Sequence, residues 1–355
     1  TIFARFVGPS FGRRHVETRR TSLENPVIKD LPNTTVSKVS KALVEIREEG
    51  GVVALGRVLT LIIQTKFSGI EDAVKAANES SREHPCRIIV LAEDDAPKKS
   101  ASAKLDAQIR VGGDAGASEV IILRAHGEAA KHSAGLVTGL LLPDAPVVAW
   151  WPGEAPESVS KSPIGQIATR RITDAASYKD PHAFLKKLSK SYAPGDSDFA
   201  WTRLTLWRAQ LAAILDQPPY DAVTAVEVTG AVDSPSTDLL AAWLEMKLKV
   251  KVDLIRTNRG KAVAGIRGVK LIRKSGDIEI VRQVPDVATL IQPTQPTREI
   301  SLPRRSLRDC LSEDLRRLDP DDLFGKVITK GFAATKKPAV TVKKPAVKSA
   351  ATKQR

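Results

Sequence analysis

Apolar side chains recur at helical spacing at several places along the chain. The first set falls three or four residues apart and is followed by a glycine pair, which ends a helix readily: Val36, Val39, Leu43 and Ile46. The same periodicity, with capping residues at some starts, predicts further helices. They lie at residues 71–82, 128–141, 181–190, 198–216, 235–247, 307–318 and 321–328.

Short apolar runs alternate with these helices. Residues 86–91 read CRIIVL and residues 147–151 read VVAWW, which have the length and the β-rich content of buried strands. Other strands are predicted at residues 57–63, 106–111, 119–123, 223–228, 250–255, 265–272 and 278–282. Strands that alternate with helices predict an α/β fold built in layers.

The chain of 355 residues is longer than a single core usually grows, so two domains are expected. Residues 152–163 are rich in Pro, Ser and Glu and form the best candidate linker, whereas residues 217–221 would place the boundary later. We therefore expect one mixed α/β domain at 29–158 and another at 159–325, which begins with the linker and a long Trp-bearing helix. A disordered extension at 1–28 and a disordered Lys/Ala/Pro-rich tail at 326–355 are expected to flank them.

The net charge of +14 is concentrated at the two ends of the chain. Residues 326–355 hold nine basic and no acidic residues, and residues 1–26 hold five arginines and two glutamates. The ends therefore carry twelve of the fourteen excess positive charges, and the predicted domains are near neutral. Nucleic acid is expected to bind only non-specifically, through the basic C-terminal tail.

The composition indicates a reducing compartment. The only cysteines are Cys86 and Cys310, which excludes a disulfide scaffold. The longest apolar stretch, at residues 136–151, is interrupted by two prolines and an aspartate and is too short to cross a membrane. No apolar run follows the paired arginines near the start, as an export signal requires. We expect a cytoplasmic protein without a membrane partner.

Signatures of catalysis are missing from the sequence. It contains no G-x-S-x-G elbow and no S-x-x-K motif, and its five histidines are scattered. His126 and His132 are six residues apart, whereas two ligands on one helical face need three or four, so no metal site is expected. We predict a protein that is not an enzyme and that binds no cofactor.

Two loops have features of a phosphate site. The glycine-rich loop at residues 111–118 follows a strand but lacks the spacing of a dinucleotide-binding loop, so a turn between two strands is favoured. Ser234, Ser236 and Thr237 stand at the predicted start of a helix, where exposed N–H groups attract anions. Helix capping by Ser234, with Pro235 in the first turn, explains the same residues.

Tryptophan and arginine supply the candidate partner-binding residues. Trp150 and Trp151 are adjacent in a strand and face opposite ways, so at least one is expected at a cleft or an interface. Four arginines are candidates for binding a sugar phosphate or an acidic surface: Arg170, Arg171, Arg203 and Arg208. Salt bridges to nearby aspartates are the alternative role for these arginines: Asp174, Asp196 and Asp198.

Several long segments carry a family resemblance. Residues 31–63 read LPNTTVSKVSKALVEIREEGGVVALGRVLTLII, and residues 106–128 read DAQIRVGGDAGASEVIILRAHGE. Residues 140–174 read LLLPDAPVVAWWPGEAPESVSKSPIGQIATRRITD, and residues 192–217 read YAPGDSDFAWTRLTLWRAQLAAILDQ. Together they resemble the actinobacterial form of the OpcA family, the glucose-6-phosphate dehydrogenase assembly proteins. The resemblance covers about residues 30–325.

The resemblance implies a non-catalytic partner that promotes assembly or activation of glucose-6-phosphate dehydrogenase and so supports NADPH production in the oxidative pentose phosphate pathway. The alternative is a sugar-phosphate-binding sensor or enzyme that acts alone. Cyanobacterial relatives are associated with thioredoxin-linked control, which two isolated cysteines do not favour here. The first 26 residues precede the resemblance, and we expect them to reflect an upstream start assignment.

Overall fold

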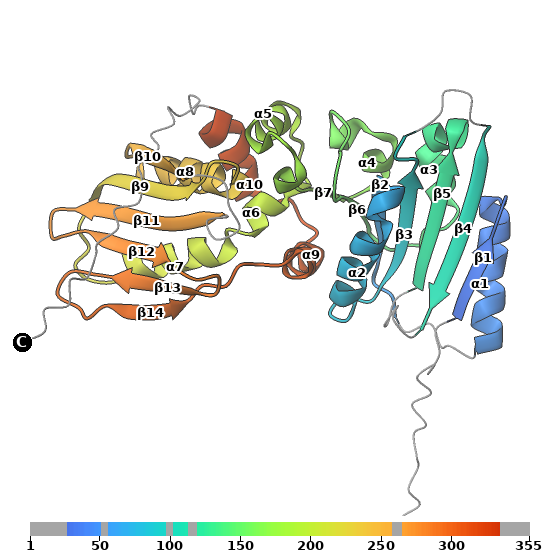
Figure 1. Ribbon diagram of the computed structural model, residues 1–355, viewed down its shortest axis with the longest axis horizontal. Coiled ribbons are helices and arrows are strands. Elements are labelled where there is room, and N and C mark those ends of the chain that lie inside the picture. Colours follow the sequence, from blue (N-terminus) through green and yellow to red (C-terminus); the bar gives the residue numbers. More distant parts are fainter. Residues whose placement is uncertain (1–26, 51–55, 97–101, 113–118, 258–264, 334–355) are drawn as a thin grey trace, which may run out of the picture.

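Two β-sheets, each with its own helices, form the part of the chain that the computed structural model describes (Figure 1). The described residues are 27–50, 56–96, 102–112, 119–257 and 265–333. The first sheet is built from the N-terminal half and the second from the C-terminal half. The predicted α/β fold class is confirmed.

The first sheet has eight strands in the order β1-β4-β5-β3-β2-β6-β7-β8. The six strands from β5 to β8 in this order are parallel, and β4 and β1 are added antiparallel at one edge. The strands are β1 Val27–Leu31, β2 Leu59–Lys66, β3 Cys86–Glu93, β4 Lys104–Val111, β5 Glu119–His126, β6 Val147–Trp151, β7 Arg170–Thr173 and β8 Asp196–Asp198.

Helices cover both faces of this sheet. On one face, Ile62 and Ile89 pack with α1 (Val36–Gly50) and α3 (Ser133–Thr138). On the other face, Leu61 and Ile63 pack with α2 (Ile70–Ser81). Because a parallel sheet is buried on both sides, its strands read as continuous apolar runs without an exposed face.

The second sheet has six strands in the order β10-β9-β11-β12-β13-β14, of which only β10 and β9 pair in parallel. Its buried face packs on α7 and α8, whereas the opposite face carries half-buried residues such as Glu227, Lys270 and Glu279. The elements are β9 Val223–Ala231, β10 Val252–Thr257, β11 Ile266–Arg273, β12 Ile278–Arg282, β13 Val287–Ile291, β14 Arg298–Ser301, α7 Thr205–Leu215 and α8 Pro235–Leu248.

The chain returns to the first sheet after the second is complete. Helix α9 (Leu307–Arg316) packs against α2 and α6 (Phe199–Thr202), and its Cys310, Leu311 and Leu315 join the core beside the first sheet. The following α10 (Asp322–Lys326) and the π-helix η7 (Val327–Phe332) lie in the core of the second sheet, where η7 contacts α8. This last segment therefore joins the two cores.

Shorter helices complete the described elements. They are α4 Pro163–Ile167, α5 Pro181–Ser191 and the 3₁₀ helices η1 Phe67–Gly69, η3 Gly127–His132, η4 Val159–Lys161 and η5 Ala175–Ser177. The helix predicted at 198–216 is in fact two helices, α6 and α7, and the helix predicted at 128–141 begins as η3. The pattern missed β1, β7, β8, β13 and β14. Among the described helices, none has the length and apolar content to cross a membrane.

The first sheet extends along the chain beyond residue 158, where the domain boundary was predicted. Strands β7 and β8 extend the first sheet to Asp198, so residues 152–163, predicted as a linker, lie within the N-terminal domain between β6 and α4. The second sheet begins at Val223, directly after the alternative boundary at residues 217–221.

The predicted terminal segments also overlap folded structure. Val327, Ile328 and Phe332 are buried, so the tail predicted from residue 326 begins too early, and the predicted extension at 1–28 includes the start of β1. The remainder of both predictions, at residues 1–26 and 334–355, lies outside the described residues, as do residues 113–118 of the glycine-rich loop. That loop joins two antiparallel strands, β4 and β5, as its interpretation as a turn predicted.

A buried carboxylate holds α1 against the first sheet. Glu119, at the start of β5, is fully buried and accepts hydrogen bonds from Arg47 of α1 at 2.8 and 2.9 Å and from Arg87 of β3 at 2.8 Å. Burial opposes ionisation, but the hydrogen bonds from Arg47 and the charges of Arg87 and Arg57 outweigh it and lower the pKa of Glu119. The carboxylate is therefore ionised in the folded protein.

We predict that Glu119→Ala lowers the free energy of unfolding by about 3–5 kcal/mol, because Arg87 is left buried without its carboxylate. Urea unfolding followed by circular dichroism measures the loss. Glu45→Ala is the matched control: it removes a partly exposed ion pair with Lys29 (3.0 Å) and should cost less than about 1 kcal/mol. Equal losses in the two variants would contradict the prediction.

A second buried carboxylate lies where β8 enters α6. Asp198 is fully buried and accepts hydrogen bonds from the hydroxyl of Thr173 at 2.7 Å and from the backbone N–H groups of Ala200 at 2.8 Å and Ala175 at 3.0 Å. Burial, together with the nearby charge of Asp174, raises the pKa of Asp198 to about 7. The folded state therefore holds a proton on this carboxyl that the unfolded state releases at a lower pH.

This raised pKa predicts a pH-dependent stability difference between the wild type and Asp198→Asn. The contribution of Asp198 to the free energy of unfolding is fully present below its unfolded pKa of 3.8. It is lost as the pH rises through the folded-state pKa of about 7. Urea midpoints measured between pH 5.5 and 8.5 should fall more steeply for the wild type than for the variant. Parallel pH profiles would show that Asp198 does not titrate in this range.

Candidate functional site

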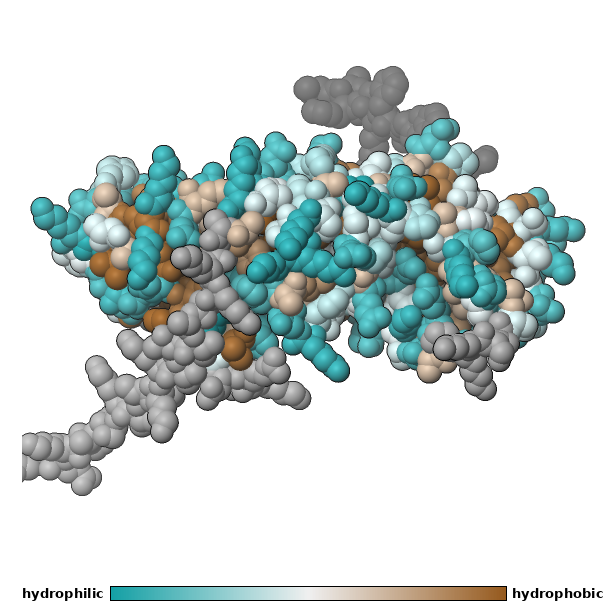
Figure 2. Space-filling model, turned by 90° about the horizontal axis from the view of Figure 1, so that it is seen from above, coloured by the Kyte–Doolittle hydropathy of each residue, from teal (hydrophilic) through white to brown (hydrophobic). Residues whose placement is uncertain are grey.

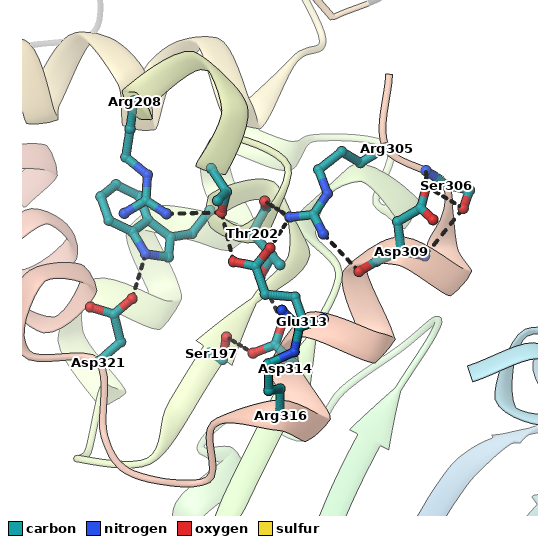
Figure 3. A network of polar contacts seen from close by, with 12 residues as sticks. Ser197, Thr202, Arg208, Arg305, Ser306, Asp309, Glu313, Asp314, Arg316 and Asp321 are labelled. Carbon is teal, nitrogen blue, oxygen red and sulfur yellow. Dashed lines mark hydrogen bonds and ion pairs between the residues drawn. The ribbon is translucent and has the colours of Figure 1, made fainter. Parts of the chain in front are cut away.

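A buried carboxylate on α9 fixes the junction between the two domains. Asp314 is 2% exposed, and its Oδ1 accepts hydrogen bonds from Nε of Arg170 at 3.0 Å and from the hydroxyl of Ser197 at 2.8 Å. Its other oxygen accepts from the hydroxyl of Thr202 at 2.6 Å. Figure 3 shows Asp314 and Ser197 pointing toward each other from α9 and β8. The C-terminal part of α9 is thus bonded to β7, β8 and α6 together.

A cavity of about 760 Å³ lies beside this cluster. One wall comes from α6 and α7 and includes Trp201, Thr205 and Arg208. The other wall comes from the end of α9 and the turn into α10, at residues 313–323. The cavity therefore lies between helices α6 and α7, which follow the first sheet, and the segment from the end of α9 to α10, which follows the second sheet.

Arg208 lies over the indole of Trp201 in this cavity. Its guanidinium carbon lies 3.9 Å from the ring centre of Trp201, and the indole N–H of Trp201 donates to Asp321 at 2.8 Å (Figure 3). Arg208 Nη2 donates to the hydroxyl of Thr205 at 3.1 Å. Burial lowers the pKa of Arg208, while the charges of Asp321 and Glu313 act in the opposite direction.

A second cavity, of about 700 Å³, lies at the carboxyl ends of β2, β3 and β6. The strand order changes direction between β2 and β6, and such switch points are where open α/β sheets usually bind ligands. Lys66 and Glu93 form an ion pair there (3.3 Å), and Gln64 accepts a hydrogen bond from Nε1 of Trp151 at 2.9 Å. Leu307, the first residue of α9, lines the same cavity.

The tryptophan pair, of which at least one member was expected at a cleft or an interface, borders a cavity but presents no exposed surface. Trp150 and Trp151 do face opposite ways, but helices cover both faces of the sheet and both side chains are 0% exposed. They line the switch-point cavity only from within the core. Neither residue is available as an exposed contact in this structure.

Three of the four candidate arginines are in salt bridges. Arg170 binds Asp314, Arg171 binds Asp196 at 2.5 Å, and Arg203 binds Asp174 at 2.7 Å. Arg170 and Arg171 are also buried, so the salt-bridge alternative describes them better than a partner surface does. Arg208 is the one predicted arginine whose side chain both lines a cavity and lacks a bonded carboxylate among the described residues.

The candidate anion site at the start of α8 is filled by the protein itself. The hydroxyl of Ser234 accepts from the backbone N–H of Thr237 at 3.3 Å, and Ser236 donates to the carbonyl of Ala200 at 2.9 Å. A Cβ atom added to Gly230 would lie 2.2 Å from the Thr237 hydroxyl, so the strand packs directly on this helix end. All three predicted residues are buried, and helix capping by Ser234 is confirmed.

The remaining candidates for chemistry are structural. Cys86 and Cys310 are buried, and burial raises the pKa of Cys310 to about 12, which disfavours its reactive thiolate. No group of three or more His, Cys, Asp or Glu side chains within the described ranges is arranged to hold a metal ion.

On the face seen in Figure 2, hydrophobic residues form separate small patches among hydrophilic ones.

Pattern analysis missed the residues that organise the junction. Asp314, Glu313 and Asp321 lie in a charged helical stretch that reads as an ordinary solvated face. Each of them has a partner more than a hundred residues away in sequence: Arg170 for Asp314, Thr205 for Glu313 and Trp201 for Asp321. The only signal was the apolar stripe of α9, which showed that one face of this helix is buried.

Comparison with known proteins gives matches over both halves of the chain. Residues 77–190 match the family model for the N-terminal domain of a glucose-6-phosphate dehydrogenase subunit, and residues 194–328 match the model for the C-terminal domain of that subunit. Among curated proteins, the chain is 30% identical over 159 residues to the "Putative OxPP cycle protein OpcA" of Synechocystis sp.. That match covers 42% of this chain and 32% of the relative, so it spans about a third of the relative's length.

Solved structures give only distant likenesses. A UDP-N-acetylglucosamine 3-dehydrogenase of Acidithiobacillus ferrooxidans has a TM-score of 0.27 and 8% identity, over 76% of this chain and 95% of that one. An E. coli structure described as trehalose-6-phosphate with bound UDP-2-fluoro glucose has a TM-score of 0.22 and 9% identity, over 56% and 64%. Neither value supports an argument about fold or function.

The two family models meet between residues 190 and 194, and together they cover most of the chain. Their order along the chain is that of the N-terminal domain followed by the C-terminal domain of one protein. The chain therefore belongs to the OpcA family of glucose-6-phosphate dehydrogenase subunits.

Proposed function

We propose that this protein is a non-catalytic assembly factor and allosteric activator of glucose-6-phosphate dehydrogenase. It would act in the cytoplasm and support NADPH production in the oxidative pentose phosphate pathway. The observation that carries the proposal is the match of both halves of the chain to domains of a glucose-6-phosphate dehydrogenase subunit. The partner is thus a protein.

The architecture is consistent with an activator that acts by binding. A partner that binds the active form of an enzyme more tightly than the inactive form shifts the population by the ratio of the two affinities. Such a partner must keep a fixed shape, because freedom lost on binding reduces the affinity. The buried bonds of Asp314 hold α9 to β7, β8 and α6, which supports a rigid two-domain body.

We predict that adding this protein to glucose-6-phosphate dehydrogenase from the same organism raises its activity at low substrate concentration by about fivefold or more, the lower range of typical allosteric coupling. Initial rates measured over a range of substrate concentrations separate an effect on KM from one on kcat. The stimulation should saturate at a fixed molar ratio, and the two proteins should co-elute in size-exclusion chromatography.

A truncated protein lacking residues 334–355 is the matched control. This segment follows the residues that the C-terminal family model covers and carries many of the basic residues, so its removal tests non-specific electrostatic attraction. The truncated protein should stimulate as well as the full chain. Absence of both stimulation and co-elution with the full chain would overturn the proposed function.

A further inference from the structure

Arg208 differs from the neighbouring arginines in how its charge is balanced. Arg170, Arg171 and Arg203 each donate hydrogen bonds to a carboxylate of their own. Arg208 donates only to the neutral hydroxyl of Thr205, and its Nε is buried without a hydrogen-bond partner among the described residues. An incompletely bonded guanidinium in a partly desolvated place is costly unless an anion or water completes its shell.

The nearby carboxylates do not complete this shell because other donors occupy them. Glu313 accepts from Thr205 at 2.7 Å and binds Arg305. Asp321 accepts from the indole of Trp201 at 2.8 Å and from the backbone N–H of Phe324 at 2.9 Å. Both contribute attraction at a distance, but neither has a described hydrogen bond with Arg208. The guanidinium therefore keeps donors free for another acceptor.

The stacking on Trp201 prepares Arg208 for recognition. A guanidinium placed over an indole gains a cation–π contact, which restricts the positions that its N–H groups can take. The N–H groups of Arg208 that Thr205 leaves unbonded can donate to an oxyanion, as in arginine complexes with phosphates and carboxylates. The fixed geometry reduces the entropy that binding must overcome.

The space in front of Arg208 suits a small molecule. The cavity of about 760 Å³ falls in the range of sites for metabolites, which are concave, whereas protein interfaces are flatter. The cavity is lined by four arginines and five carboxylates, of which Arg316, Arg317, Asp319 and Asp322 are exposed at its rim, so the charges of the lining nearly cancel. Selection for an anion must then come from Arg208 inside the cavity.

We infer that this cavity binds a small organic oxyanion, a phosphate monoester or a carboxylate, through the N–H groups of Arg208 that have no partner among the described residues. The ligand would lie between α7 on one side and the α9–α10 turn on the other, in contact with both walls of the junction. This inference goes beyond the proposed function and does not depend on it, because the site is complete within this chain.

Isothermal titration calorimetry of the full chain tests the inference in low-salt buffer without phosphate. The probes are inorganic phosphate, glucose 6-phosphate and citrate, which separate the phosphate and carboxylate classes. At least one should bind saturably to the wild type. Arg208→Gln should weaken that binding by about tenfold or more, because hydrogen bonds to charged groups are among the strong ones.

Two further variants make the test specific. Arg82→Gln removes one positive charge from an exposed site directly after α2 and should leave the affinity unchanged. Arg317→Gln changes an exposed rim residue without disturbing the fold and should weaken binding by a smaller factor, about twofold to threefold. No saturable binding of any probe to the wild type, or equal affinities of wild type and Arg208→Gln, would overturn the inference.

Discussion

The carboxylate of Asp314 is the interaction on which the two-domain arrangement depends. It comes from the C-terminal part of the chain, yet it is buried among β7, β8 and α6 and bonded to Arg170, Ser197 and Thr202. A buried carboxylate is tolerated only where its charge and its lone pairs are satisfied. This requirement selects one position of α9, because the three donors come from three different elements. The cavity that Arg208 lines is formed by the same elements and has its shape from that position.

The buried polar groups of the N-terminal domain follow the same rule. Glu119 binds Arg47 and Arg87, and Asp198 accepts from Thr173 and two backbone N–H groups. These carboxylates lie at ends of strands, where the backbone leaves the sheet and N–H groups need acceptors. The fold thus joins its layers through ionised or strongly bonded carboxylates as well as through apolar packing. Buried acids of this kind mark joints of the structure and do not by themselves indicate catalysis.

Sequence patterns predicted most of the helices and the central strands, because their apolar periodicity is a local property. They missed β7 and β8, which are short and contain charged residues such as Arg170 and Asp196 that become buried through partners distant in sequence. The tryptophan pair shows the same limit. Opposite orientation of Trp150 and Trp151 followed from strand geometry, but their exposure depended on whether helices cover both faces of the sheet. Of the four predicted arginines, only Arg208 combines a cavity with an unbonded donor among the described residues, and this could be recognised only once the partners of the other arginines were known.

Helix α9 connects the two cavities of the molecule. Its first residue, Leu307, lines the switch-point cavity, and its C-terminal part forms a wall of the cavity around Arg208. A rigid helix of ten residues transmits displacement of one end to the other, since its backbone hydrogen bonds resist bending. Because the bonds of Asp314 select one position of α9, coupling between the two cavities would require a second position of the helix that both bound molecules distinguish. Linkage requires this effect to be equal in both directions, so an anion at Arg208 that strengthens the binding of a protein partner must itself be bound more tightly when that partner is present.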